Sequence, residues 1–320
     1  MRDLARLVGV LSRAKKLHPG PDPRCVRGEN RVAGNGWGFD SYAPRKPTGG
    51  RLVLLHGWTL RGKDDPRLVA FAQSLAVAGI ACVVPHLPGL ADLALQPADV
   101  EGLGQFLKEE GAEAGVVGFS LGGSYALLAA RAAAPRFVTA ISGYGDLPGL
   151  YAHWAAWGKT PPTETSARES WLYMKLVLAF RLRRGLRWSE AEQRELEKHL
   201  RAFCEGGDRG GAWAFYERAL APHDLEALDG RAQDPSVLRE LSLVEHPPTL
   251  TCPVVILHDK HDAAVPASQA DLAAQAVRAG SPGITVEVLV TELLQHVSPK
   301  MALKPWEIAR LLSLLSPLVQ

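Results

Sequence analysis

The sequence is poor in cysteine and carries almost no excess charge. Its four cysteines (Cys25, Cys82, Cys204 and Cys252) are far apart and show no Cys-x-x-Cys spacing. A disulfide framework is therefore not expected, and a reducing compartment, the cytoplasm, is favoured. The formal net charge is +2 at pH 7, and a balance this even gives no electrostatic reason to expect a nucleic-acid partner.

The sequence also lacks a long apolar run. Near the N-terminus the apolar stretch Leu7–Leu11 is soon interrupted by Arg13, Lys15 and Lys16, so it is too short for a secretory signal or a membrane span. We interpret residues 1–23 as a surface-docked amphipathic segment and expect no stable membrane insertion. A targeting or docking role for this segment is the alternative.

Short apolar segments alternate with helix-length segments over much of the chain. The apolar segments, which we expect to be strands, are Arg51–His56, Ile80–Pro85, Ala114–Phe119, Phe137–Ser142, Pro253–His258 and Ile284–Val290. Helical spacing is found in Pro66–Ala78, Pro97–Glu110, Leu121–Ala134, Ser268–Ala279 and Trp306–Leu315. Strands that are apolar throughout and separated by helices predict an α/β fold with a mostly parallel sheet covered on both faces.

The alternation stops between residues 148 and 248. This stretch has no strand-like run, and helical spacing occurs in Trp171–Arg187, Ser189–Phe203 and Gly210–Leu220, with Ser189 as the expected N-cap of the second helix. We therefore expect one α/β core made of residues 24–147 and 249–320. Residues 148–248 are expected to form a helical cap.

A nucleophile motif lies where an expected strand meets an expected helix. Residues 118–122 read Gly-Phe-Ser-Leu-Gly and fit the pattern G-x-S-x-G around Ser120. A serine in such a sharp turn has a strained backbone and presents its hydroxyl at the edge of the sheet, and the two glycines avoid collisions with neighbouring backbone. The alternative is a glycine-rich turn with an incidental serine.

A serine hydroxyl becomes a good nucleophile only when a base removes its proton and a third group orients that base. Asp262 and His296 each follow an expected strand, in the loops where open α/β sheets place their sites. The chain order predicts a catalytic triad of Ser120, Asp262 and His296. Asp146, which follows an earlier strand, is the alternative acid.

Together these motifs resemble those of the α/β-hydrolase superfamily. The resemblance rests on His56-Gly57-Trp58 after an early strand, the G-x-S-x-G around Ser120, the Asp-x-x-Val-Pro of residues 262–266 and the late His296. It implies an esterase-type serine hydrolase that needs no cofactor, with an oxyanion hole formed by the backbone N–H groups of Trp58 and Leu121. It also implies a structural role for His56.

The chain departs from the superfamily pattern at two positions. Asp259 stands where a glycine often follows the strand-end histidine, and Leu293-Leu294-Gln295 precede His296 where a glycine is common. The second departure concerns the residues just before His296, the expected general base. No other histidine follows the last expected strand, so His296 is retained.

The expected reaction is hydrolysis of a carboxylic ester of a small molecule through an acyl-enzyme, with the helical cap acting as a lid. The same triad could cleave a thioester, a peptide or a carbon–carbon bond. A non-catalytic binding protein of the same fold is the alternative from another class. The sequence specifies neither the acyl group nor the oligomeric state.

Two further clusters allow competing interpretations. His258, Asp259, His261 and Asp262 are possible metal ligands, but adjacent positions of one loop rarely converge on one ion, so no metal is expected. A basic run, Arg181, Arg183, Arg184 and Arg187, is interpreted as a solvated helix end, with attraction of anionic substrates as the alternative.

The aromatic residues of the expected cap are predicted to lie mainly in the core of the cap itself. They are Trp154, Trp157, Trp171, Tyr173, Trp213 and Phe215.

Overall fold

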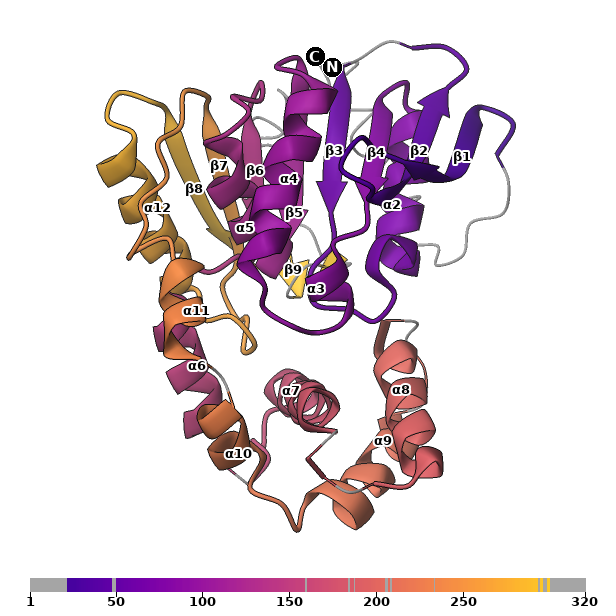
Figure 1. Ribbon diagram of the computed structural model, residues 1–320, viewed down its shortest axis with the longest axis vertical. Helices are drawn as coiled ribbons and strands as arrows, with labels where there is room; N and C mark the ends of the chain where they lie inside the picture. The colour runs from indigo at the N-terminus through magenta and orange to yellow at the C-terminus, as the bar shows by residue number, and fades with distance from the viewer. Residues whose placement is uncertain are drawn as a thin grey trace.

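The computed structural model describes residues 22–47, 50–158, 160–183, 185–186, 188–204, 207, 209–232, 234–292, 294–295 and 298–299. The strands of its main sheet are β1 (Cys25–Val32), β2 (Gly38–Pro44), β3 (Arg51–Leu55), β4 (Ala81–Pro85), β5 (Ala114–Phe119), β6 (Val138–Ile141), β7 (Val254–Asp259) and β8 (Val286–Thr291). They lie in the order β1-β2-β4-β3-β5-β6-β7-β8 (Figure 1). All pairs from β4 to β8 are parallel, and β2 is antiparallel to both of its neighbours. The predicted mostly parallel α/β fold is confirmed.

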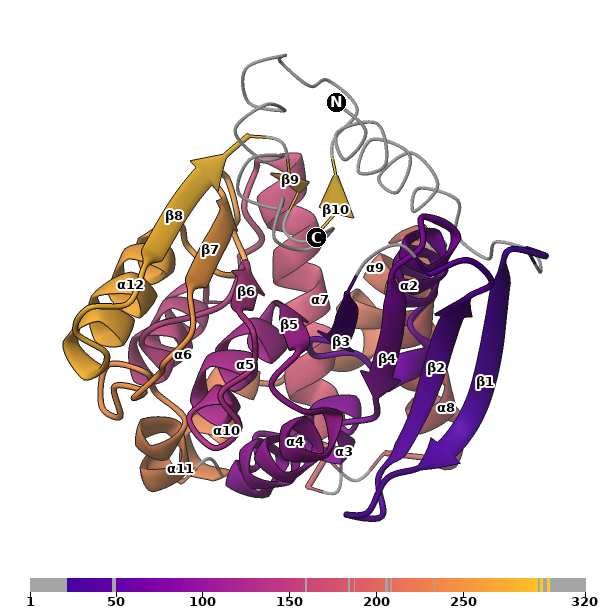
Figure 2. The same cartoon turned by 90° about the horizontal axis from the view of Figure 1, so that it is seen from above.

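Helices cover both faces of this sheet (Figure 2). They are α2 (Pro66–Val77) on one face and α4 (Pro97–Glu110), α5 (Leu121–Ala130) and α12 (Ser268–Gly280) on the other. Strand β3 has apolar side chains on both faces of the sheet, so both faces must be covered by helices. Its Leu52 and Leu54 join one buried apolar cluster with Leu75 of α2, whereas Val53 and Leu55 belong to the cluster on the opposite face, as the two-residue period of a strand requires.

The predicted helices and strands of the core are found with small differences at their ends. Helix α4 and strand β5 have the predicted bounds, whereas α5 ends at Ala130, before the predicted Ala134. The strands β1 and β2 were not predicted. Most of β1 is exposed, so its sequence shows no apolar run. The predicted helix Trp306–Leu315 lies outside the described residues.

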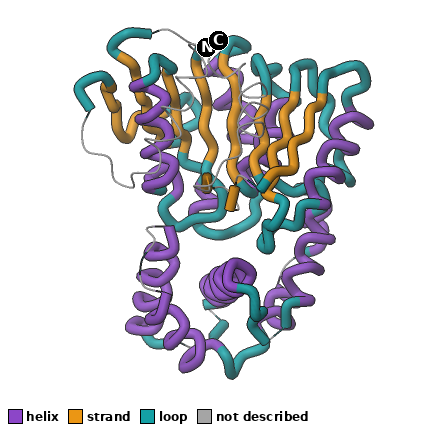
Figure 3. Tube along the Cα trace, turned by 180° about the vertical axis from the view of Figure 1, so that it is seen from behind, coloured by secondary structure: helices purple, strands orange, loops and turns teal. Residues whose placement is uncertain are grey.

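Among the described residues between β6 and β7, the regular elements are all helical and none is a strand. They are α6 (Leu147–Ala156), α7 (Thr165–Leu182), α8 (Glu190–Cys204), α9 (Arg209–Phe215), the π-helical turn η2 (Tyr216–Leu220), α10 (Leu225–Ala232) and α11 (Pro235–Glu240). We call residues 147–240 the helical insertion. It lies beyond the carboxyl ends of the parallel strands, as Figures 1 and 3 show from opposite sides. None of the helices in the described part of the chain is both long and apolar enough to cross a membrane.

Side-chain hydrogen bonds fix where helix α8 begins. Ser189 Oγ accepts a hydrogen bond from the Glu192 N–H at 3.3 Å, and the Glu192 carboxylate accepts one from the Ser189 N–H at 2.8 Å. This reciprocal capping box satisfies N–H groups that the first turn of α8 leaves without helical partners. The predicted N-cap is therefore confirmed.

Buried polar groups hold the two ends of the insertion together. The chain leaves the core at residues 145–146, whose two N–H groups both donate to the side-chain oxygen of Gln269 in α12. It returns past Leu241, whose carbonyl accepts a hydrogen bond from the hydroxyl of the fully buried Tyr144 at 2.9 Å. The Val244 N–H then donates to the carbonyl of Gly145 at 3.1 Å. The insertion is thus anchored at the carboxyl end of β6.

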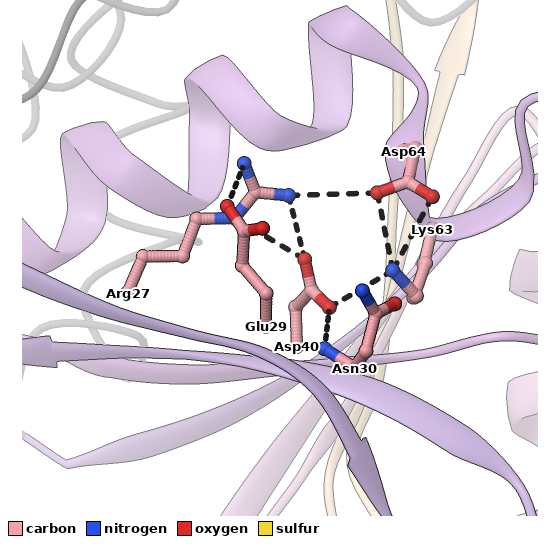
Figure 4. A network of polar contacts seen from close by, with 6 residues as sticks. All are labelled: Arg27, Glu29, Asn30, Asp40, Lys63 and Asp64. Atoms are coloured by element: carbon pink, nitrogen blue, oxygen red, sulfur yellow. Dashed lines mark hydrogen bonds and ion pairs between the residues drawn. The ribbon is translucent and has the colours of Figure 1, made fainter.

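A buried carboxylate ties the edge strands to the loop after β3 (Figure 4). Asp40 of β2 is fully buried. Its Oδ2 lies 2.6 Å from Nη2 of Arg27 in β1, and its Oδ1 lies 2.9 Å from Nζ of Lys63 in the 3₁₀ turn η1 (Gly62–Asp64). A bulge in β1 turns the Asn30 N–H toward Asp40, to which it donates at 2.9 Å. Burial alone would raise the pKa of Asp40, but these three donors outweigh it and hold the pKa below its usual value.

Replacing Asp40 by alanine is expected to lower the free energy of unfolding by about 3 kcal/mol at neutral pH, because Lys63 stays buried without its main partner. Since the folded-state pKa of Asp40 is depressed, the stabilisation is complete above about pH 4 and is lost as the pH falls through that pKa. Urea unfolding at about pH 7 and about pH 3 measures both effects. Glu29→Gln, which removes an exposed partner of Arg27, is the control and should cost less than about 0.5 kcal/mol. Equal losses in the two variants would contradict the assignment.

Candidate active site

Ser120 is the single residue between strand β5 and helix α5. Its backbone has φ 52° and ψ −131°, a region that non-glycine residues rarely adopt. Two hydrogen bonds hold this conformation, because the Ser120 N–H donates to the carbonyl of Ile141 at 2.7 Å and the Gly123 N–H donates to the carbonyl of Ser120 at 2.8 Å. Strain of this kind persists only where the surroundings enforce it, and it clusters at functional sites.

The two glycines of the motif have no room for a side chain. A Cβ at position 118 would lie 2.3 Å from the carbonyl oxygen of Gly122, and a Cβ at position 122 would lie 2.2 Å from the carbonyl oxygen of His56. Both obstacles are backbone atoms, which cannot move aside without displacing a strand or a helix. The tight turn at Ser120 therefore depends on glycine at both positions.

The loop after β3 passes directly beside Ser120. A Cβ at Gly57 would lie 2.8 Å from the Cβ of Ser120. The ring of His56 is buried, and both of its nitrogens are engaged: Nδ1 lies 2.8 Å from the carbonyl oxygen of Gly57, and Nε2 accepts from the Leu87 N–H at 3.1 Å. Burial lowers the pKa of His56 to about 4, so the ring is neutral at pH 7 and fixes the loop that precedes Trp58.

Two backbone N–H groups, those of Trp58 and Leu121, belong to the two segments that meet at Ser120. Leu121 is the first residue of α5, so its N–H has no partner within the helix. No group in the described part of the chain accepts a hydrogen bond from the N–H of Trp58 or of Leu121. The N-terminus of a helix carries partial positive charge. This arrangement is chemically suited to stabilise an oxyanion formed on a group attached to Ser120.

Asp262 lies in the loop after β7. Strands β5, β6 and β7 are adjacent and parallel, so the loops that carry Ser120 and Asp262 emerge at the same edge of the sheet. The Asp262 carboxylate is buried, and its Oδ1 accepts hydrogen bonds from the N–H groups of Ala264 at 3.0 Å and Val265 at 2.9 Å. Its Oδ2 lies 3.9 Å from Nε2 of the buried His258. Asp146, at the N-cap position of α6, is only half-buried, and its side chain does not cap that helix.

The predicted base, His296, lies outside the described residues. The preceding short strand β9 (Leu294–Gln295) is described; it pairs with β10 (Ser298–Pro299) and contacts β7. His258 in β7 and Lys260 just after it make local contacts: His258 Nε2 lies 2.8 Å from the carbonyl oxygen of Val265, and Lys260 pairs with Glu292 at 3.0 Å. Within the described ranges no group of three or more potential ligands is placed to hold a metal ion.

The helical insertion reaches the loop after β3 through several side chains. Arg201 of α8 donates to the carbonyl of Leu60 at 3.4 Å, and three others contact Trp58. The hydroxyl of Tyr173 in α7 donates to the carbonyl of Trp58 at 2.7 Å. Trp154 of α6 stacks on the Trp58 ring with centroids 5.7 Å apart. The guanidinium of Arg181 lies 5.5 Å from the centre of the same ring. These contacts place the insertion against one side of the candidate site.

The interpretation of Arg181 as part of a solvated helix end is wrong. Its side chain is only 12% exposed and forms an ion pair with the buried Asp229 of α10 at 3.2 Å. Burial lowers the pKa of the guanidinium, and the Asp229 carboxylate partly offsets this effect. The sequence signal that could have revealed this was Asp229, an acidic residue 48 positions further along the chain (229 − 181). Arg184 and Arg187 lie outside the described residues.

Comparison with known proteins agrees with this geometry. An eight-stranded α/β sheet with a strained serine between a strand and a helix defines a class of hydrolytic folds. The family model described as "Alpha/beta hydrolase family" matches residues 52–296, which is more than half of the chain. The chain therefore belongs to the alpha/beta hydrolase family, and this membership supports a hydrolase activity.

Several solved structures share the fold at low sequence identity. The Francisella virulence factor BioJ is 14% identical, with 98% of this chain and 92% of that chain covered at a TM-score of 0.54. An arylesterase is 11% identical, with 98% and 90% covered at a TM-score of 0.53. A Pyrococcus furiosus esterase is 12% identical, with 91% and 90% covered at a TM-score of 0.52. These likenesses establish the fold alone.

Other comparisons add little to this. An acylaminoacyl peptidase is 14% identical over 83% of this chain at a TM-score of 0.45, and the chain spans 36% of the length of that protein. A comparison with functionally curated sequences finds no significant match.

Gly122→Ala is expected to lower the free energy of unfolding by at least about 3 kcal/mol, because the new methyl group would overlap the carbonyl of His56 and force β3 and α5 apart. Gly230→Ala in α10 is the matched control, since a Cβ there meets nothing within 4 Å. It should be neutral or stabilising by up to about 1 kcal/mol. Thermal and urea unfolding of both variants measure the difference. A fully stable Gly122→Ala protein would refute the packing described for the turn.

Proposed function

We propose that the protein is a serine hydrolase that cleaves carboxylic esters of small molecules through a triad of Ser120, His296 and Asp262. The observation that carries this proposal is the strained backbone of Ser120 at the strand–helix junction. Family membership over residues 52–296 supports it, because the matched segment contains all three positions.

In the proposed mechanism the Ser120 hydroxyl attacks the ester carbonyl while His296 accepts its proton. The negative charge that develops on the carbonyl oxygen is stabilised by the N–H groups of Trp58 and Leu121. His296 then protonates the leaving alcohol, giving an acyl-enzyme, and later removes a proton from the water that hydrolyses it. Asp262 holds the imidazole in the required tautomer and stabilises its charged form.

The environment of Asp262 favours it over Asp146 as the orienting acid. The Oδ1 of Asp262 is fixed by two N–H donors, so its Oδ2 has a defined direction. A carboxylate held in this way can orient an imidazole. Asp146 is half-buried, its carboxylate lies against Gly149 of its own helix, and it does not accept a hydrogen bond at the start of that helix.

We further propose that the helical insertion is a cap over the site, which limits the size of the substrate and excludes water. Tyr173 and Arg181 of α7 support this proposal through their contacts with Trp58.

We also propose a cytoplasmic location for the protein. Its support is that Cys25, Cys82 and Cys252 are free thiols in the described part of the chain, as in a reducing compartment.

Ser120→Ala and His296→Ala are each expected to lower kcat for p-nitrophenyl esters by about 10⁴–10⁶-fold, because either change removes the activated nucleophile. Asp262→Asn should lower kcat by about 10⁴-fold, because the imidazole loses its orienting charge. Initial rates across a series of acyl chain lengths, with thioester and amide substrates in parallel, measure these effects and the substrate class.

Asp146→Asn is the matched control for the acid and should change kcat by less than about threefold. A result in which Asp146→Asn abolishes activity and Asp262→Asn does not would exchange the two roles. Ester hydrolysis by Ser120→Ala near the wild-type rate would reject the proposed mechanism altogether.

Labelling Ser120 with a long-chain alkyl fluorophosphonate is expected to slow amide hydrogen exchange in α7 about tenfold or more, because an occupied site stabilises the closed cap. Helix α4, which belongs to the core and not to the insertion, should be unchanged. Exchange followed by mass spectrometry compares free and labelled protein. Protection confined to the core loops, with α7 unaffected, would rule out the cap.

A further inference from the structure

The carboxylate of Asp262 is held by two consecutive peptide groups. The N–H of Ala264 and the N–H of Val265 both donate to its Oδ1, at 3.0 and 2.9 Å. Each of these N–H groups shares a rigid, planar peptide unit with the carbonyl of the residue before it. The direction of the carboxylate therefore depends on the orientation of the two planes, 263–264 and 264–265.

The carbonyl ends of the same two planes are held by neighbouring side chains of α6. The carbonyl oxygen of Ala263 lies 3.1 Å from Nε2 of His153. The carbonyl oxygen of Ala264 accepts a hydrogen bond from the indole Nε1 of Trp154 at 2.6 Å. Each peptide unit is thus hydrogen-bonded at both ends. When the carbonyl of a peptide unit accepts a hydrogen bond, the N–H of the same unit becomes a stronger donor.

Trp154 also contacts the opposite side of the site. Its ring is buried, with 4% of the residue exposed, and it stacks on Trp58 at an interplanar angle of 26°. One indole therefore touches the loop of the proposed acid through its N–H and the loop of the proposed oxyanion hole through its ring face. Helix α6 follows the anchored point where the insertion leaves the core, so its first turns have a fixed position (Figure 1).

We propose that His153 and Trp154 are positioning residues that align the Asp262 carboxylate through the peptide planes 263–264 and 264–265. Trp154 in addition fixes the distance between this loop and Trp58. The inference rests on the proposed triad, because it concerns the orientation of its acid. It gives α6 a role in the reaction itself, beyond covering the substrate.

Such a role affects the chemical step more than substrate binding. A misaligned Asp262 leaves the imidazole in a mixture of orientations, so fewer enzyme–substrate complexes react and kcat falls. In this role His153 and Trp154 act through the Asp262 carboxylate and not through the substrate, so KM should stay within about twofold of the wild-type value. A defect limited to packing of the insertion would instead alter KM and stability.

The test compares Trp154→Phe, which keeps a ring against Trp58 but removes the indole N–H, with Trp213→Phe. Trp213 stacks on Trp171 inside the insertion and serves as the matched control. Trp154→Phe should lower kcat for a p-nitrophenyl ester about fivefold to tenfold at unchanged KM, and Trp213→Phe should leave both constants within about twofold. His153→Leu should lower kcat about threefold to fivefold, and His153→Gln, which retains an N–H donor, should restore most of it.

A double-mutant cycle separates alignment of Asp262 from a general structural effect. In an Asp262→Asn background, Trp154→Phe should change kcat by less than about twofold, because no charged acid remains to be aligned. If Trp154→Phe lowers kcat by the same factor in the Asp262→Asn background, or leaves kcat at the wild-type value in the otherwise unchanged protein, the inference is overturned. The proposed function still stands in either case as long as Ser120→Ala is inactive. Activity of Ser120→Ala would instead overturn the proposed function, and the inference with it.

Discussion

The close approach of three backbone segments at Ser120 is the constraint on which the site depends. Strand β5 turns into α5 within a single residue, and the carbonyl of His56 occupies the space that a side chain at position 122 would need. The strained φ of Ser120 follows from this packing, since the residue has no other route from strand to helix. The stability of the buried sheet therefore maintains the conformation that exposes the hydroxyl at the edge of the sheet.

The helical insertion is connected to this edge through specific polar contacts. Tyr173 donates to the carbonyl of Trp58, and Trp154 bonds to the carbonyl of Ala264. These two loops follow different strands and carry different parts of the proposed machinery. Both loops receive hydrogen bonds from the insertion, so under the proposed function the insertion helps to align the groups of the core.

Much of the core could be predicted from the sequence, because parallel strands buried on both faces are apolar runs that stand out, as in β5 and β7. The strands β1 and β2 escaped prediction because the exposed β1 has no such run and is held partly by the buried ion pairs of Asp40. The position of Ser120 could be predicted because its glycines are close in sequence. The burial of Arg181 could not, since it depends on Asp229 and on a helix–helix contact that no local pattern encodes. The contacts of His153 and Trp154 with the carbonyls of residues 263 and 264 could not be predicted from the sequence for the same reason.

The proposed mechanism requires that the hydroxyl of Ser120 becomes covalently acylated during turnover. The most direct test mixes the protein with p-nitrophenyl acetate, quenches the reaction in acid within the first turnover and maps the added mass by peptide mass spectrometry. One acetyl group is expected on the peptide that contains Ser120, formed at the rate at which p-nitrophenol is released. Acetylation of a different residue, or release of p-nitrophenol with no acetyl group bound to the protein, would contradict it.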